Sequence, residues 1–420
     1  MKRHALFASL LFAVGTAFAA GNEKRPGPLL DRLGGLHHPV TTSSRLAQRY
    51  FDQGLILLFA FNHQEAARSF RSAAMVDPAC GMGWWGVAYA LGPHVNKPMS
   101  AEDNALAWDA LQRAQAAAPG LSPREQAYLR ALAARYEAQP REDRAPLDRA
   151  FADAMRELVR AYPDDLDAQV CFAEALMNTM PWDYWTKDRM PKPETEEALA
   201  ALRFVLARNP DHPGANHFYI HAVEAGPQPE LGVDSADRLQ RFAPGAGHLV
   251  HMPAHIYFRV GRYDDAVTAN VLAVKADEMY IRRLRAQGFY PGVYYPHNIH
   301  FLWYALAYDG RSREALKAAE KAAEYALDNW CGPSKALEAP RLRHLPWITA
   351  ARFGRWDDVL RVPQPAATND FLVDRAMWHF TRGLAFAARG DAATAAAEHA
   401  SLAELAASDA ARALDNPAFP

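Results

Sequence analysis

Between Ala47 and Pro78 the chain twice places apolar residues at the spacing of one helix face. The first run, AQRYFDQGLILLFAF, is followed by the polar turn NHQ and then by a second run, EAARSFRSAAMV. Apolar residues that recur every three or four positions predict amphipathic helices. Two such runs joined by a short polar break predict a helical hairpin. Strand-like alternation of useful length is missing from the sequence, so the pattern predicts an all-α protein.

The hairpin pattern recurs along most of the chain. Further units begin near Gly81, Ser122, Leu166, Pro213, Gly247, Pro296, Pro340 and Ala376. Four junctions between helices, VGRYDDAV, DGRSREAL, FGRWDDVL and ARGDAATA, carry a glycine where a helix has to end in a left-handed residue. We therefore predict about nine stacked hairpins over residues 44–407.

The first hairpin resembles a tetratricopeptide (TPR) repeat. Counted from Ala47, the matching residues are Tyr50 (fourth), Gly54 (eighth), Leu57 (eleventh), Ala66 (twentieth), Phe70 (twenty-fourth), Ala73 (twenty-seventh) and Pro78 (thirty-second). The resemblance implies an α-solenoid, a right-handed superhelix whose concave groove usually binds peptides or proteins. The blocks NHFYIHAVEAG, GHLVHMPAHIYFRVGRY and YYPHNIHFLW also look like those of exported bacterial TPR-repeat proteins. That closer resemblance implies a site without implying an activity.

The N-terminus has the pattern of a secretory signal peptide. Lys2 and Arg3 precede an apolar run that ends at Ala17-Phe18-Ala19. We predict a signal peptide over residues 1–19, an extended segment over residues 20–43 and a tail over residues 408–420. The protein is then exported, to the periplasm or the medium, and no later stretch is long and apolar enough to span a membrane.

Charge and cysteine content exclude other classes of protein. The formal net charge of -2 gives no basic excess of the kind that a nucleic-acid partner calls for. Three cysteines are too few for a disulfide framework. Cys80 and Cys171 are predicted to be small core residues and Cys331 a thiol in a loop.

Histidines concentrate on one predicted helix face. In a TPR-like unit, positions two, five, nine and twelve lie on one stripe of the first helix, and the resemblance implies that this stripe lines the groove. Seven of the 16 histidines fall on that stripe in three consecutive units: His217, His221, His248, His251, His255, His297 and His300. We therefore predict that they converge on one pocket. Pro253 interrupts the series, so a helix is expected to start there, with His248 and His251 approaching from the preceding turn.

Imidazoles from neighbouring helices can share a metal ion, together with a carboxylate such as Glu224 or Glu174. Such donors suit Zn, Cu, Fe or Mn. In a catalytic site, either Glu would be a ligand, an orienter of a histidine or a general base, and Tyr304 a hydrogen-bond donor or an electron acceptor. We also expect Trp85 and Tyr89 to line an apolar ligand-binding end of the groove, and His344 to lie at the rim. The alternatives are a metal-free groove for an acidic ligand, and a polar network that hydrates the superhelix.

Three functions fit these features. The first is an exported TPR-type binding protein whose His/Glu-rich groove holds a transition-metal ion or a metal-containing ligand. The second is a metal-dependent enzyme, a hydrolase or an oxidase, that uses the same groove. The third is a metal-free scaffold for protein–protein interaction. The expected partners are a small-molecule or peptide ligand in the groove, or another protein, and not nucleic acid.

Overall fold

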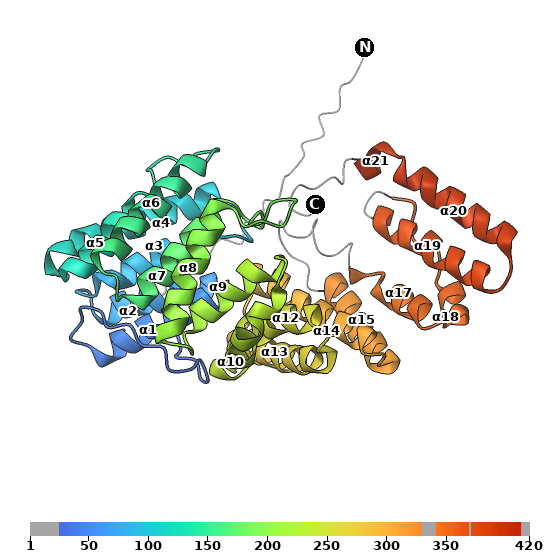
Figure 1. Ribbon diagram of the computed structural model, residues 1–420, viewed down its shortest axis with the longest axis horizontal. Helices are drawn as coiled ribbons and strands as arrows, with labels where there is room; N and C mark the ends of the chain where they lie inside the picture. The colour runs from blue at the N-terminus through green and yellow to red at the C-terminus, as the bar shows by residue number, and fades with distance from the viewer. Residues whose placement is uncertain (1–24, 329–341, 369–370, 413–420) are drawn as a thin grey trace, which may run out of the picture.

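The computed structural model describes residues 25–328, 342–368 and 371–412, and every regular element within these ranges is a helix (Figure 1). The first half contains α1 (Arg45–Phe59), α2 (His63–Val76), α3 (Gly81–Ala90), α4 (Ala101–Ala117), η1 (Ala118–Gly120), α5 (Pro123–Ala133), α6 (Ala145–Ala161), α7 (Leu166–Asn178) and α8 (Pro193–Arg208). Next come α9 (Pro213–Glu224), η2 (Pro229–Gly232), α10 (Val233–Phe242), α11 (Gly247–His251), α12 (Pro253–Arg259), α13 (Tyr263–Leu284) and the π-helical turn η3 (Tyr290–Tyr294). The chain continues with α14 (Tyr295–Tyr308), α15 (Ser312–Asp328), α17 (Leu345–Arg352), α18 (Trp356–Arg361), α19 (Leu372–Ala388), α20 (Ala392–Ala406) and α21 (Asp409–Arg412).

Helices that follow one another along the chain pack as hairpins. The pairs are α1–α2, α3–α4, α5–α6, α7–α8, α9–α10, α11 and α12 with α13, α14–α15, α17–α18 and α19–α20. Each hairpin also packs against the next one, and the series follows a curved path in Figure 1. The fold is a TPR-like α-solenoid, which confirms the predicted fold class.

The glycines of the four predicted junctions end helices as expected. Gly261, Gly310, Gly354 and Gly390 have φ values of 79°, 77°, 68° and 81°. A residue with a Cβ is strained in this left-handed region, whereas glycine adopts it freely. These turns reverse the chain after α12, α14, α17 and α19, and so define the second helix of each hairpin.

Close helix packing in the first two units depends on Phe70 of α2. Its ring is fully buried between Gly54 of α1 and Gly86 of α3. A Cβ at Gly86 would lie 2.3 Å from the ring of Phe70, and a Cβ at Gly54 would lie 2.5 Å from it. Small residues at these TPR-like positions therefore let three helices share one aromatic side chain.

The superhelix brings the first hairpin back against the middle of the chain. Helix α1 packs on α9, and the Tyr280 hydroxyl at the C-terminal part of α13 donates to Asn62 between α1 and α2. The corner between α1 and α2 is therefore buried against helices more than 150 residues away along the chain. Cys80 and Cys171 are buried free thiols, as predicted, whereas Cys331 and the signal-peptide residues lie outside the described residues.

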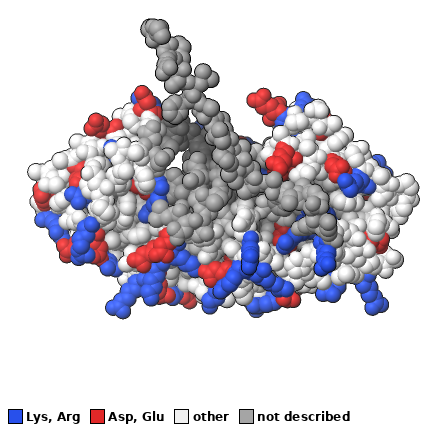
Figure 2. Space-filling model, turned by 180° about the vertical axis from the view of Figure 1, so that it is seen from behind, with Lys and Arg blue, Asp and Glu red and all other residues white. Residues whose placement is uncertain are grey.

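The surface carries charges of both signs. On the face in Figure 2, basic and acidic side chains are interspersed along the lower edge. No helix among the described residues is both long enough and apolar enough to cross a bilayer.

Candidate metal centre

Six of the seven predicted histidines come together in the core, in two groups of three. Triad A consists of His217 and His221 of α9 and His248 of α11. Triad B consists of His251 of α11, His255 of α12 and His297 of α14. Within each triad, one potential ligand atom from each ring lies within 4.8 Å of the others.

Local backbone structure explains how one short segment supplies histidines to both triads. Pro253 is the first residue of α12, as predicted, and His248 and His251 lie on the separate short helix α11. Met252 between the two helices keeps helical dihedral angles, φ -51° and ψ -37°. The chain therefore continues nearly as one helix across the proline, and His251 and His255 remain one turn apart on the same face.

In triad A, the Nε2 atoms of His217 and His248 lie 3.1 Å apart. The Nδ1 of His217 donates to the carbonyl oxygen of Phe59 at 2.6 Å, because a carbonyl can only accept. Neutral imidazole carries a single N–H, so the Nε2 of His217 holds a lone pair. The Nε2 of His221 is buried and has no hydrogen-bond partner.

In triad B, the Nε2 of His251 lies 2.9 Å from that of His255 and 3.1 Å from that of His297. The Nδ1 of His251 donates to Oδ1 of Asn270 at 2.7 Å. The amide of Asn270 is fixed in this orientation because its Nδ2 donates to the carbonyl oxygen of Ala266. The Nε2 of His251 therefore presents a lone pair to its two neighbours.

Glu224, the last residue of α9, connects the two triads. Its Oε1 accepts from Nδ1 of His221 at 2.9 Å, and its Oε2 accepts from Nδ1 of His255 at 2.6 Å. Burial raises the pKa of the Glu224 carboxyl, but the charges and hydrogen bonds of the two histidines outweigh burial and hold it well below the usual range. When the two imidazoles are neutral, the ionised carboxylate keeps the proton of each on Nδ1 and so leaves one Nε2 of each triad unprotonated.

These hydrogen bonds make the contact between His251 and His255 unfavourable without a cation. Both Nδ1 atoms donate to oxygen acceptors, so in the neutral state of both rings two lone pairs face each other across 2.9 Å. Metal–nitrogen bonds of roughly 2.0 to 2.1 Å at angles of about 90 to 110° place two ligating nitrogens about 2.9 to 3.4 Å apart. The separations of 2.9 and 3.1 Å in triad B fall within that range.

Each triad has its own phenylalanine. The ring centroid of Phe61 lies 4.5, 5.7 and 5.1 Å from those of His217, His221 and His248. The ring of Phe301 lies 4.7, 4.5 and 4.7 Å from those of His251, His255 and His297. Phe61 adopts a left-handed φ of 54°, which is strained for a residue with a bulky side chain. The backbone at the α1–α2 corner is therefore strained at Phe61, the residue whose side chain covers triad A.

Burial favours the neutral imidazole in most of the cluster. It is the main reason why the pKa values of His217, His248, His251 and His297 lie well below 6.5. Neighbouring histidines lower these pKa values further because their positive charges would repel.

The seventh histidine and the predicted tyrosine lie outside the triads on α14. His300 packs against Trp303, with ring centroids 5.2 Å apart. Tyr304 stacks on Phe258 at 4.4 Å, and burial raises the pKa of its hydroxyl to about 12. Tyr304 is therefore a neutral phenol at neutral pH, and its hydroxyl donates to Tyr308 at 3.4 Å.

The other predicted site residues lie in different parts of the core. Glu174 of α7 accepts a hydrogen bond from the Tyr89 hydroxyl at 2.9 Å, and burial raises the pKa of its carboxyl. Trp85 and Tyr89 are each 2% exposed, because the turns of the superhelix close over this face and make it core. His344, before α17, lies 3.8 Å from Asp374.

Sequence reasoning missed Phe61, Asn270 and Phe301, which shape the centre. It also missed His212, whose Nε2 donates to Asp167 at 3.1 Å while Nδ1 of His38 donates to the other oxygen of that carboxylate at 2.7 Å. His38 and His212 lie outside the groove stripe, and only contacts between distant segments join them to Asp167. Of these residues, only Phe301 could have been suspected from the sequence, because it directly follows the histidine-containing block PHNIH.

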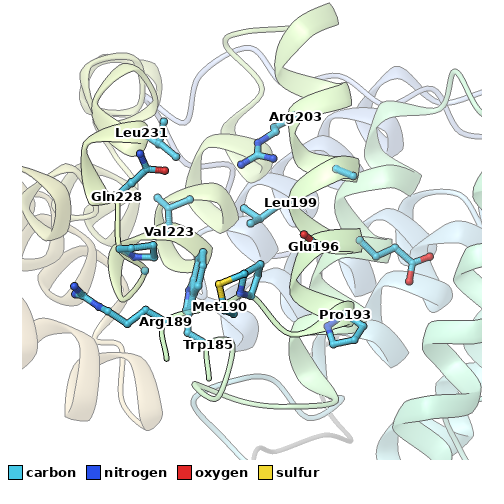
Figure 3. Close-up of a pocket in the computed structure, with 15 residues that line it drawn as sticks. Trp185, Arg189, Met190, Pro193, Glu196, Leu199, Arg203, Val223, Gln228 and Leu231 are labelled. Atoms are coloured by element: carbon cyan, nitrogen blue, oxygen red, sulfur yellow. The ribbon is translucent and has the colours of Figure 1, made fainter. Parts of the chain in front are cut away.

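A surface pocket of about 820 Å³ lies near the centre but does not contain it. Trp185, Leu199, Val223 and Leu231 form part of its apolar lining, with Arg189, Arg203 and Glu196 also around it (Figure 3). None of the six histidines lines this pocket. The indole of Trp185 donates to the carbonyl of Ala222, and so fixes the pocket wall to the same helix, α9, that carries His217 and His221.

No family model matches the chain, and no curated protein matches it at a significant level. Three solved helical structures are similar over most of its length. A human IFIT1 dimer with m7Gppp-AAAA has 12% identity and a TM-score of 0.35, covering 88% of this chain and 92% of its own. Yeast Tom70 has 12% identity and a TM-score of 0.28, covering 88% and 87%. The TPR domain of P58(IPK) has 12% identity and a TM-score of 0.22, covering 89% and 97%.

Identities and TM-scores this low carry no information about the histidine centre. The class of protein follows from the molecule itself, from its paired helices and their glycine turns. It is a TPR-like helical-repeat protein with six clustered histidines in its core.

Proposed function

We propose that the protein is an exported metal-binding protein of the TPR-like class that holds two transition-metal ions, one in each histidine triad. The observation that carries this proposal is the approach of His251 and His255 through their Nε2 atoms at 2.9 Å, while both Nδ1 atoms donate to other acceptors. A single shared proton would relieve that one contact. A metal ion can bind all three Nε2 atoms, including that of His297, which lies 3.1 Å from the same atom of His251.

The donor set narrows the choice of metal. All six candidate ligands are imidazoles, and Glu224, the carboxylate that hydrogen-bonds to them within the described part of the chain, accepts from Nδ1 atoms. Imidazole suits zinc, copper and iron, whereas manganese prefers oxygen ligands. We therefore propose Zn, Cu or Fe in preference to Mn.

Hydrogen bonds behind the ligands favour a metal centre over a network of incidental histidines. Phe59, Asn270 and Glu224 each accept from an Nδ1 atom and so turn an Nε2 atom toward the triads. Metal-bound histidines typically have such an acceptor on the second ring nitrogen. The arrangement also disfavours the metal-free scaffold, because buried lone pairs without a partner destabilise a fold.

The test is the metal content of protein purified after export, measured by elemental analysis against protein concentration. We expect two equivalents per chain, and about one in a His255→Ala variant. His300→Ala is the matched control, since it removes an imidazole from the same cluster of helices but outside both triads, and should keep two equivalents. Wild-type protein that takes up no stoichiometric Zn, Cu or Fe would refute the proposal and leave the metal-free scaffold.

A further inference from the structure

The two triads differ in their access to solvent. His217, His221 and His248 of triad A are 0%, 3% and 2% exposed. In triad B only His251 is fully buried, whereas His255 and His297 are partly exposed. The side chain of His255 is 10% exposed and that of Glu224 beside it is 18% exposed. The more exposed histidines of the centre are therefore those of triad B.

Aromatic rings close triad A on several sides. Besides Phe61, the buried rings of Phe218 and Tyr294 lie 5.1 Å from that of His217 and 4.8 Å from that of His248. The ring of Trp182, 5.2 Å from that of His221, is itself 47% exposed. These rings come from four separate segments of the chain. Because the three histidines are almost completely buried beneath these rings, release of an ion from triad A requires the packed core to open locally.

Triad B has one aromatic neighbour that touches all three of its rings, Phe301, and this ring is itself partly exposed. Three imidazoles fill three positions of a four-coordinate metal ion and leave the fourth free for water or another ligand. Because neutral imidazoles leave the ion its full positive charge, the free position prefers a small anion.

We propose that the ion in triad B is the exchangeable one and binds a small monodentate anion of the size of hydroxide or azide, whereas the ion in triad A is closed to exogenous ligands. This inference rests on the proposed function. Binding is a ligand substitution in which the anion replaces a coordinated water and no electron is transferred. Glu224 is a positioning residue here, since both of its oxygens accept from histidines and it acts on the ions through them.

The experiment uses the full chain loaded with cobalt(II), whose visible spectrum reports its ligands. Azide is titrated into wild-type protein and into two variants that each lose one ligand, His297→Ala in triad B and His217→Ala in triad A. We expect an azide-dependent spectral change in the wild type and in His217→Ala, and its loss in His297→Ala. If His297→Ala does not fold, His255→Gln removes another ligand of the same triad, also at a partly exposed position.

A chelator gives a second, independent readout. Dipicolinate should remove one cobalt equivalent about tenfold faster than the other or more, because only triad A requires opening of the packed core. His297→Ala should lack the fast phase, and His217→Ala the slow phase.

Three results would overturn the inference: no response to azide, a response that disappears only in His217→Ala, or removal of both equivalents in one phase. Failure of the proposed function looks different, since the wild-type protein would then take up no cobalt.

Discussion

The Glu224→Gln substitution tests how the two triads are prepared for metal. The carboxylate accepts one hydrogen bond on each oxygen, from Nδ1 of His221 and from Nδ1 of His255. The amide of glutamine has nearly the same shape but only one acceptor, and its other end is a donor. One of the two histidines must therefore face an NH2 group, shift its proton to Nε2 and lose the lone pair that points into its triad.

The expected loss follows from that change of tautomer. Removing the partner behind a metal-bound histidine typically weakens metal binding about 10- to 100-fold, or about 1.4 to 2.7 kcal/mol. We expect this loss for one of the two ions, with the affinity for the other nearly unchanged. The shorter hydrogen bond of His255, 2.6 Å against 2.9 Å for His221, favours retention of the acceptor by His255. The affinity of triad A for its ion is then the one that falls.

The assay is a competition titration with a chromophoric chelator, which resolves two affinities, together with thermal unfolding of the metal-loaded protein. Glu230→Gln is the matched control, because Glu230 is an exposed residue of η2 a few positions along the chain. Two affinities equal to those of the wild type would refute the tautomer argument. An equal fall in affinity for both ions would also refute the tautomer argument, since it would mean that Glu224 acts through its charge alone.

Three further substitutions test the packing and hydrogen bonds of the helices around the centre. Gly86→Ala places a methyl group 2.3 Å from the ring of Phe70 and should destabilise the fold by about 1 to 3 kcal/mol in urea unfolding. Asp167→Asn removes the negative charge between two histidines and should cost about 1 to 3 kcal/mol near neutral pH. Because the pKa of Asp167 is lowered in the fold, this difference should begin to shrink below about pH 4, where the unfolded carboxyl becomes protonated, and should be lost only as the pH falls through the lower pKa of the folded protein. Phe61→Ala opens the wall of triad A and should speed the slow phase of metal removal in stopped-flow chelation.

Each of these changes has a control or a contrary outcome. Gly292→Ala adds a methyl group where no atom lies within 4 Å, so it should leave the unfolding midpoint nearly unchanged. The Asp167 argument fails if the variant and the wild type differ by the same amount at pH 3 and pH 7. An unchanged slow phase in Phe61→Ala would mean that another element limits escape from triad A.

Much of the architecture could be predicted from local sequence. The helical period, the recurring units and the glycine junctions depend on residues only a few positions apart, and Gly261, Gly310, Gly354 and Gly390 all adopt the expected left-handed turn. The common face of the histidines could be predicted for the same reason. Six of seven lie together because helices of one repeat class place equivalent positions on equivalent faces.

The division of the histidines into two triads could not be predicted in this way. His248 joins His217 and His221 of the preceding hairpin, whereas His251, three residues later, joins His297 of the following one. That split depends on the rotation between neighbouring hairpins. The spacing of histidines within one helix carries no information about this rotation. Glu174 and Glu224 both lie on the predicted groove stripe. Glu224 accepts hydrogen bonds from histidines of the centre, whereas Glu174 accepts one from the Tyr89 hydroxyl.

The repeated helical hairpins, their turns and a shared histidine face are encoded locally, because each follows from interactions within one hairpin. Long-range packing makes most of this face part of the core, since the superhelix returns the α1–α2 corner to α9 across 158 residues of chain. That return places the carbonyl of Phe59 and the ring of Phe61 against His217. The physical reason is that burial and tautomer are set by packing between distant segments. Periodicity along the chain places a side chain on a face but does not specify what covers that face.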